Sequence, residues 1–274
     1  MAANLPERYV VIGNPIAHSR SPDIHAQFAR QCSQPIDYQR LLAPLDGFAA
    51  AVAEFIGQGG RGANVTVPFK LEAHALATRL TPRAQAAGAV NTLRFDQTEI
   101  LGDNTDGAGL VADIERNAGV AIADKTVLLL GAGGAARGVV LPLLACGPAQ
   151  LVIANRTRSK AAEIATHFGA DGPVTASEFA HLAQRFDIVI NATSASLASQ
   201  LPPIPASVFD HATLAYDMMY GAQPTVFMQF ATAQGATARD GLGMLVEQAA
   251  ESFFLWRGVR PDTGAVLADL RRAL

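Results

Sequence analysis

Short apolar runs alternate along the chain with glycine-rich turns and with longer segments of helical character. The clearest runs span 9–12, 126–130, 151–154, 188–191 and 214–217, and further runs span 38–42, 63–67, 89–95 and 236–239. Continuous apolar runs of this length are typical of strands buried on both faces, and intervening helices imply parallel strands joined by crossovers. The pattern predicts an α/β protein with largely parallel sheets.

Helix signals and polar loops divide this series into two parts. Ser21-Pro22-Asp23 supplies a predicted N-cap, a proline at the first helical position and an acidic first turn. The polar loop 102–109 precedes a second series of strands that begins at Thr126, and the tail from Leu242 has helical spacing. We predict two α/β domains with largely parallel sheets, an N-terminal one of residues 1–105 plus 242–274 and a second of residues 106–241, with a cleft between them.

Composition narrows the class of protein. Half of the 274 residues are hydrophobic and 16% are charged, which excludes a disordered or coiled-coil chain. The formal net charge of -3 gives no general basis for binding nucleic acid or an anionic membrane. The uncharged stretches 138–154 and 188–209 are interrupted by Pro, Gly or polar residues, so neither predicts a membrane span. Cys32 and Cys146 and the scattered histidines match no metal spacing, and we expect a cytoplasmic protein without a metal site.

A glycine-rich turn follows the predicted strand 126–130. Its sequence, Gly131-Ala132-Gly133-Gly134-Ala135-Ala136, has the G-x-G-x-x-A pattern and leads into a helical segment. In this context the first glycine permits a tight turn, the second removes a Cβ that would keep a pyrophosphate away, and the helix N-terminus offers free N–H groups. The pattern indicates a dinucleotide cradle, and the alternative is a turn that binds nothing.

The next predicted strand ends in a basic segment, Asn155-Arg156-Thr157-Arg158-Ser159-Lys160. NAD-dependent enzymes usually carry an Asp or Glu here, which binds the ribose 2′-hydroxyl. Three cations at this position suit a 2′-phosphate instead. We therefore predict NADP as the cofactor, the alternative being a solvated basic turn.

Polar residues also occur where strands of the first part end, which is where open α/β sheets bind ligands. They are Ser19, Ser21, Asn64, Thr66, Lys70, Asn91, Thr105 and Asp106. Each has an ordinary structural explanation, since Ser21 and Asp106 can cap helices and Lys70 can be a solvated lysine. However, Pro68 indicates a helix start at which a cation opposes the helix dipole. Together these residues predict a pocket for hydroxyl and carboxylate groups.

The motifs taken together resemble the shikimate dehydrogenase family. The matching segments, in family order, are 13–22, 64–70, 88–92, 102–107, 131–135, 155–157, 191–194, 216–220 and 240–249. The glycine-rich turn alone is unspecific, whereas Ser-x-Ser, Asn-Val-Thr and Asn-Thr-Asp-Gly in one chain are highly specific. The resemblance runs from about residue 9 to the C-terminus. One departure is the stretch after Ser194, which lacks a glycine often found in relatives.

The resemblance implies the reversible NADP-linked reduction of 3-dehydroshikimate to shikimate, a step of aromatic amino-acid biosynthesis. It implies that residues 1–105 plus 242–274 form an N-terminal, mainly parallel substrate-binding domain and that residues 106–241 form a Rossmann-type NADP-binding domain. It implies that Ser19 and Ser21 hold the substrate carboxylate. The residues implied around the substrate ring are Asn64, Thr66, Asn91, Asp106, Tyr220 and Gln248. The cofactor is expected to contact residues 131–135 and 155–160, with Met218 and Gly241 near its nicotinamide end.

Lys70 and Asp106 are the predicted catalytic pair. Hydride addition to a ketone builds negative charge on its oxygen, which the Lys70 ammonium can stabilise and protonate. In the oxidative direction the amine takes the proton back. Asp106 can accept hydrogen bonds from a substrate hydroxyl and from Lys70, and so orient both.

Three alternatives stay open. An NAD-preferring quinate/shikimate dehydrogenase is disfavoured by the basic segment 155–160 and by the two serines. A non-catalytic relative that senses NADP or a metabolite is disfavoured because Lys70 and Asp106 are both present. A folate-linked dehydrogenase of similar architecture would not need two serines for a small carboxylate. The sequence also leaves open the oligomeric state, with a homodimer as one option.

Overall fold

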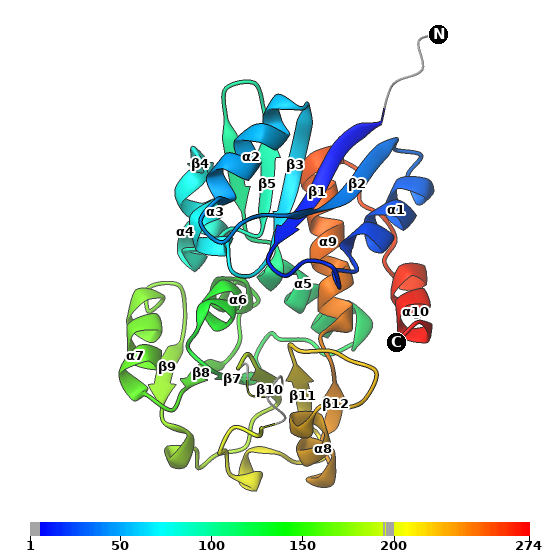
Figure 1. The fold of residues 1–274 in the computed structure, drawn as a ribbon. Helices are drawn as coiled ribbons and strands as arrows, with labels where there is room; N and C mark the ends of the chain where they lie inside the picture. Colours follow the sequence, from blue (N-terminus) through cyan, green and yellow to red (C-terminus); the bar gives the residue numbers. More distant parts are fainter. Residues whose placement is uncertain (1–5, 194, 196–199) are drawn as a thin grey trace. The chain divides into compact units, whose positions relative to one another are not determined.

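The computed structural model describes residues 6–193, 195 and 200–274, and the chain divides into two units. Unit 1 comprises Met1–Asp106 and Val246–Leu270, and unit 2 comprises Gly107–Leu245 and Arg271–Leu274. Each unit contains a six-stranded sheet with helices packed against it (Figure 1). Every helix among the described residues is too short or too polar to span a bilayer.

The sheet of unit 1 has the strand order β2-β1-β3-β5-β6-β4. Its strands are β1 (Glu7–Gly13), β2 (Ile36–Leu42), β3 (Gly60–Val65), β4 (Arg79–Leu80), β5 (Thr92–Phe95) and β6 (Ile100–Asp103). β1 pairs parallel with β2 and β3, and β4 pairs parallel with β6, whereas β5 runs antiparallel to β3 and β6. The sheet is mainly parallel as predicted, and β5 is the exception because a tight turn after Phe95 returns the chain to β6.

Helices cover both faces of this sheet (Figure 1). They are α1 (Ser21–Gln31), α2 (Phe48–Gly57), α3 (Lys70–Leu76), α4 (Pro82–Ala87), most of α9 (Leu242–Arg257) and most of α10 (Gly264–Arg272). Val10 and Ile12 of β1 pack in one core cluster with residues of α2, α3 and α4, whereas Tyr9 and Val11 pack in another with Trp256 of α9. Successive side chains of a strand point to opposite faces, so the continuous apolar run of β1 serves both cores.

The sheet of unit 2 is wholly parallel, in the order β12-β11-β10-β7-β8-β9. Its elements are α5 (Asp106–Ala112), a π-helix (Asp113–Asn117), β7 (Thr126–Leu130), α6 (Gly134–Ala145), β8 (Gln150–Ala154), α7 (Arg158–His167), β9 (Val174–Ser177), β10 (Ile188–Asn191), β11 (Leu214–Asp217), α8 (Val226–Ala233) and β12 (Thr237–Arg239). The chain runs outward from β7 to β9 and then returns to β10 on the other side of β7. This is the doubly wound Rossmann order, as predicted, and its switch point between β7 and β10 is where such sheets bind ligands.

Candidate active site

Lys70 and Asp106 form a direct ion pair in unit 1. Lys70 is the first residue of α3, after Pro68, and its Nζ donates to Asp106 Oδ2 at 2.6 Å. The side chains are 32% and 17% exposed, so the pair is partly shielded but reachable from solvent. The Asp106 carboxylate offsets the unfavourable position of an ammonium at a helix N-terminus. This contact explains why the chain tolerates a lysine there.

Asp106 is hydrogen-bonded through both its backbone and its carboxylate. Its backbone N–H donates to Asn104 Oδ1 at 3.2 Å, and its carboxylate Oδ1 accepts from Asn91 Nδ2 at 2.8 Å. Asn91 Nδ2 also lies 3.4 Å from Gln248 Oε1 of α9. The structure therefore brings together four of the predicted residues: Lys70, Asn91, Asp106 and Gln248.

Asn64, at the end of β3, is linked to this group through buried hydroxyls. Its Oδ1 accepts from Tyr38 Oη at 2.7 Å, and its Nδ2 donates to Ser252 Oγ at 2.9 Å and to Thr92 Oγ1 at 3.1 Å. The sequence patterns did not single out Tyr38 or Ser252. Tyr38 lies within a predicted strand, but Ser252 follows Gln248 by four residues, a spacing that places both on one helix face.

The prediction that Ser21 is an N-cap is wrong. Ser21 is the first helical residue of α1, and Arg20 occupies the N-cap position without a side-chain cap. Ser19 does the bonding instead, since its Oγ accepts from the Ser21 N–H at 3.3 Å. The reason is a turn in which the Ser19 N–H donates to the Ile16 carbonyl at 3.1 Å, which carries Ser19 onto the helix end.

Ser19 and Ser21 lie close to a tyrosine and an arginine. The Ser21 side chain is buried and hydrogen-bonds to Tyr38; burial raises the pKa of Tyr38 well above its usual value, and this bond acts in the opposite direction. The Arg40 guanidinium donates twice to the Ser19 carbonyl, at 3.1 and 2.6 Å. Two hydroxyls beside a guanidinium suit a carboxylate ligand. The strand pattern gave no signal for Arg40.

Thr66 follows β3 and lies against Gly13. The Thr66 N–H donates to the Ile12 carbonyl at 2.9 Å, which continues the pairing of β1 with β3 for one residue. A Cβ at Gly13 would clash with the Thr66 methyl group. Gly13 thus leaves the space that Thr66 needs, and Thr66 is half-buried at the carboxyl end of the sheet.

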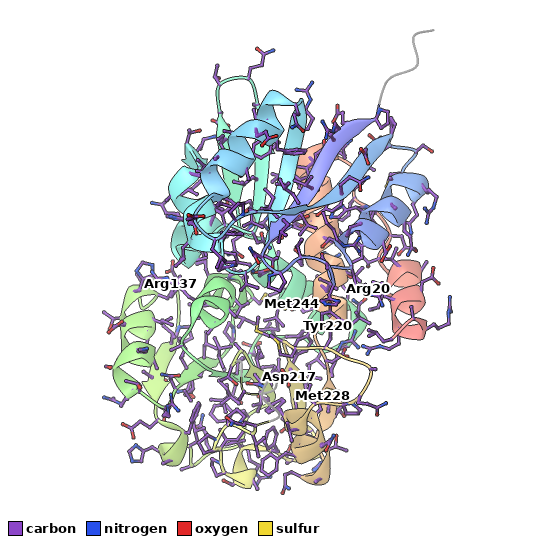
Figure 2. All side chains as sticks on the ribbon, viewed as in Figure 1. Arg20, Arg137, Asp217, Tyr220, Met228 and Met244 are labelled. Carbon is purple, nitrogen blue, oxygen red and sulfur yellow. The ribbon has the colours of Figure 1, made fainter. Side chains whose placement is uncertain are left out.

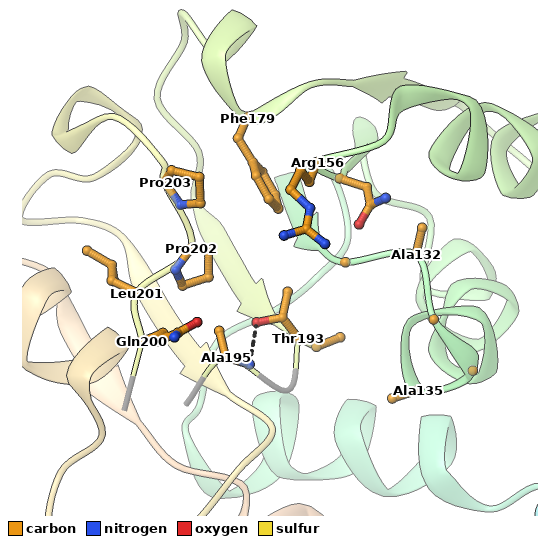
Figure 3. A pocket seen from close by; sticks show the side chains of 15 residues that line it. Ala132, Ala135, Arg156, Phe179, Thr193, Ala195, Gln200, Leu201, Pro202 and Pro203 are labelled. Carbon is orange, nitrogen blue, oxygen red and sulfur yellow. Dashed lines mark hydrogen bonds between the residues drawn. The ribbon is translucent and has the colours of Figure 1, made fainter. Parts of the chain in front are cut away.

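Unit 2 contains a cavity of about 490 Å³ at the carboxyl ends of its central strands (Figure 3). It is lined by Gly131, Ala132, Gly133, Gly134, Ala135, Asn155, Arg156, Phe179, Ala192, Thr193, Ala195, Gln200, Leu201, Pro202 and Pro203. Gly131 has a φ of +107°, and a Cβ there would lie 3.2 Å from the Thr193 methyl group. A Cβ at Gly133 would meet no described atom within 4 Å. The open space over Gly133, at the start of α6, fits a pyrophosphate.

Only part of the basic segment 155–160 lines this cavity. Asn155 and Arg156 do so, and Figure 3 shows the Arg156 side chain beside the Phe179 ring. Arg158 and Lys160 are exposed residues of α7, and Thr157 is its N-cap residue; none of the three lines the cavity. Arg156 is therefore the cation best placed to meet a ligand in the cavity.

Met218 and Gly241 contact one another in unit 2. The Met218 N–H donates to the Asn191 carbonyl at 3.0 Å, and a Cβ at Gly241 would clash with the Met218 carbonyl oxygen. Neither residue lines the described cavity. Tyr220 lies in the loop after β11 and is 38% exposed (Figure 2). Ser194 and the residues 196–198 that follow it lie outside the described residues.

Family models match most of the chain. The model described as shikimate dehydrogenase substrate binding domain matches residues 11–93, that of shikimate / quinate 5-dehydrogenase matches 113–200, and that of the shikimate 5′-dehydrogenase C-terminal domain matches 241–271. A shikimate dehydrogenase (NADP(+)) of Herminiimonas arsenicoxydans is 68% identical over 99% of this chain and 100% of its own length. The chain belongs to the shikimate dehydrogenase family. The resemblance seen in the sequence motifs is thereby confirmed.

Solved structures agree with this assignment to the shikimate dehydrogenase family. An Ael1 enzyme from Pseudomonas putida has a TM-score of 0.94 and 50% identity, over 96% of this chain and 98% of its own. A shikimate 5-dehydrogenase from Thermus thermophilus, solved in complex with NADP(H) and shikimate, has a TM-score of 0.87 and 33% identity, over 98% of this chain and 100% of its own.

Proposed function

We propose that this chain is an NADP-dependent shikimate dehydrogenase, which catalyses the reversible reduction of 3-dehydroshikimate to shikimate. The observation that carries the proposal is the 2.6 Å contact between Lys70 Nζ and Asp106 Oδ2, in a chain 68% identical to a shikimate dehydrogenase. A lysine paired with a carboxylate among buried amides is an arrangement suited to proton transfer at a carbonyl or alcohol oxygen. The Rossmann cavity of unit 2 supports a dinucleotide as the second ligand.

Lys70 is the proton donor in the reduction. NADPH, when bound, would supply the hydride. As charge develops on the substrate oxygen, the Lys70 ammonium stabilises it and gives up a proton from Nζ. Asp106 holds that ammonium through Oδ2 and is itself held by Asn91 through Oδ1. In the oxidative direction the neutral amine accepts the proton from the alcohol.

The remaining polar residues orient the substrate. Ser19 and Ser21 bind its carboxylate, and the Arg40 guanidinium, bonded to the Ser19 carbonyl, adds a complementary charge. Asn64, Thr66, Asn91 and Gln248 contact the ring and its hydroxyls, and Tyr220 is assigned to the same role.

The cofactor is assigned to the cavity of unit 2. Residues 131–135 hold the pyrophosphate, and Asn155 and Arg156 hold the adenosine end with its 2′-phosphate. Thr157, Arg158 and Lys160 would contribute positive potential or backbone groups at the start of α7, and Met218 and Gly241 would contact the nicotinamide end. A cytoplasmic location and a homodimer stay predictions.

A spectrophotometric assay tests this function directly. We expect purified protein to reduce NADP with shikimate, and to react much more slowly when quinate replaces shikimate or NAD replaces NADP. Comparable rates with quinate and NAD would support the quinate/shikimate alternative. An absence of turnover, together with NADP binding in a fluorescence titration, would support the non-catalytic alternative and reject the proposal.

A further inference from the structure

Three completely buried hydroxyl groups meet beneath the candidate site in unit 1. They belong to Thr92 of β5, Thr105 in the loop after β6, and Ser252 of α9, and each residue is 0% exposed. Ser252 Oγ lies 2.8 Å from Thr92 Oγ1 and 3.3 Å from Thr105 Oγ1, and the two threonine oxygens are 3.4 Å apart. We call this group the hydroxyl triad.

The hydroxyl triad contacts all three carboxamides assigned to the substrate. Asn64 Nδ2 donates to Ser252 and Thr92, at 2.9 and 3.1 Å. The Asn91 carboxamide accepts from Thr92 Oγ1 and donates to Thr105 Oγ1, each at 2.9 Å. Gln248 Oε1 accepts from Thr105 Oγ1 at 3.3 Å. The triad therefore connects the three amides, because each of them has at least one hydrogen-bond partner in it.

Ser252 is the nearest of three acceptors that fix which way the Asn64 carboxamide faces, the others being Thr92 Oγ1 and the Asn91 carbonyl. The Ser252 hydroxyl has one proton, which can go to the Gln248 backbone carbonyl at 3.0 Å or to Thr92 Oγ1 at 2.8 Å, and in both cases its oxygen is left to accept from Asn64. An acceptor there requires the nitrogen of Asn64, and the Asn64 oxygen then faces the Tyr38 hydroxyl, which donates to it at 2.7 Å. The flipped amide would bring two acceptors together in a buried site, which is strongly disfavoured.

We infer that Ser252 is a positioning residue for substrate binding, which fixes the amide orientation of Asn64 and, through Thr92 and Thr105, that of Asn91 and Gln248. The inference rests on the proposed function, because those amides act on the substrate. Replacing Ser252 by alanine removes the nearest acceptor of Asn64 Nδ2 and leaves the longer contacts to Thr92 Oγ1 and the Asn91 carbonyl, which hold the amide less firmly. We then expect weaker binding of the substrate and unchanged binding of the cofactor.

Two conservative variants and one control test this inference. Ser252→Ala and Thr92→Val each remove one hydroxyl of the triad at nearly constant volume. The control is Thr213→Val in unit 2, which removes a buried hydroxyl away from the triad. Thr213 is 1% exposed, and its Oγ1 donates to the Phe186 carbonyl at 2.8 Å. The measurements are KM for shikimate, KM for NADP, kcat and the unfolding midpoint of each variant.

We expect Ser252→Ala and Thr92→Val to raise KM for shikimate about tenfold, with KM for NADP changed less than about twofold. Thr213→Val should lower the unfolding midpoint but leave both KM values unchanged. If the triad variants lower only the midpoint and keep the wild-type KM for shikimate, the hydroxyls are structural and the inference is wrong. If the wild-type protein does not oxidise shikimate, the proposed function is wrong. That failure is seen with the wild-type protein alone and is therefore distinct from failure of the inference about the triad.

Discussion

The candidate site of unit 1 and the cavity of unit 2 differ in which groups form them. In unit 1 the groups are side chains, such as Lys70, Asn91 and Asp106, and they bond to one another over 2.6 to 2.8 Å. In unit 2 the part of the cavity that fits a pyrophosphate is backbone at Gly131 and Gly133, and a Cβ at Gly133 would meet no described atom within 4 Å. The site of unit 1 thus consists of side chains that hydrogen-bond to one another, whereas the cavity of unit 2 offers open space above the glycine-rich turn.

This difference predicts how each site responds to substitution. A side chain in a mutually bonded group also orients its neighbours, so its loss reaches beyond its own contact with the ligand. A side chain at the edge of a backbone cradle contributes its own contact and little else. The chemistry of unit 1 should therefore be sensitive to single changes, whereas binding in unit 2 should weaken in smaller steps.

The largest expected effect is that of Lys70→Ala. Removing the ammonium takes away the proton donor and leaves the Asp106 carboxylate without its main partner, so we expect kcat to fall roughly 10²–10⁴-fold, with KM for NADP nearly unchanged. Steady-state assays with shikimate and NADP measure both. Lys125→Ala is the matched control, because Lys125 of unit 2 is paired more loosely, 3.7 Å from Asp187. Near-normal turnover of the Lys70 variant would remove this lysine from the chemistry.

Arg156→Ala should have a smaller effect, confined to the cofactor. Arg156 lines the cavity, so loss of its charge-assisted contact to a 2′-phosphate should raise KM for NADP about 10–100-fold. KM for NAD, which lacks that phosphate, should change little. Arg158→Ala is the comparison variant, and we expect it to raise KM for NADP less than Arg156→Ala does, since Arg158 is exposed on α7 and does not line the cavity. Equal effects of the two variants would show that the whole basic segment acts as a diffuse charge.

The two sites also differ in how far the sequence predicts them. The cradle of unit 2 is local, because the strand, the turn at Gly131 and the helix follow one another in the chain, and β7 begins and ends at the predicted residues. The site in unit 1 is assembled from distant segments, and Lys70 lies 36 residues before Asp106. Residue types at strand ends indicated the members of the site, but pattern alone does not indicate which side chains bond to which.

What the sequence missed has identifiable physical causes. The strands β4, β6 and β9 were not predicted because they are short or carry polar and glycine residues, as in Ile-Leu-Gly-Asp of β6. Arg40 and Tyr38 lie in a strand whose apolar pattern was its only clear signal, and Ser252 lies in a helix that carries several other polar residues. Each acquires its role from a contact across the fold, which no local pattern encodes.

His25 provides a contrast with the bonded polar groups of unit 1. It is 0% exposed in α1, its ring stacks on Tyr38 with centroids 4.2 Å apart, and neither ring nitrogen has a hydrogen-bond partner among the described residues. Burial lowers the pKa of His25 from 6.5 to about 3, with the nearby Asn64 side chain acting in the opposite direction. We therefore expect a neutral imidazole in the folded protein near neutral pH, and we expect the shift to appear in the pH dependence of stability.

The smallest expected effect, that of His25→Phe, follows from this shift. Between pH 6.5 and about 3 the unfolded chain binds a proton on His25 that the folded protein refuses, so the free energy of unfolding falls as the pH falls. Above pH 6.5 both states are neutral and the term vanishes. At pH 5 the penalty is about 2 kcal/mol, so the variant should lose that much less stability than wild type between pH 8 and pH 5.

Denaturant unfolding at the two pH values measures this difference and separates it from packing. A change in stability at pH 8 reports how well phenylalanine fits among Tyr38, Phe28 and Phe253, whereas only the change between the two pH values reports titration. His181→Gln is the control for the loss of a histidine outside the core, because the His181 side chain is 73% exposed. If His25→Phe retains the full wild-type loss at pH 5, other groups cause that loss. His25 would then have to gain its proton in the folded state, which requires a hydrogen-bond partner for its ring nitrogens. It would in that case resemble the hydrogen-bonded polar side chains of the candidate site in unit 1.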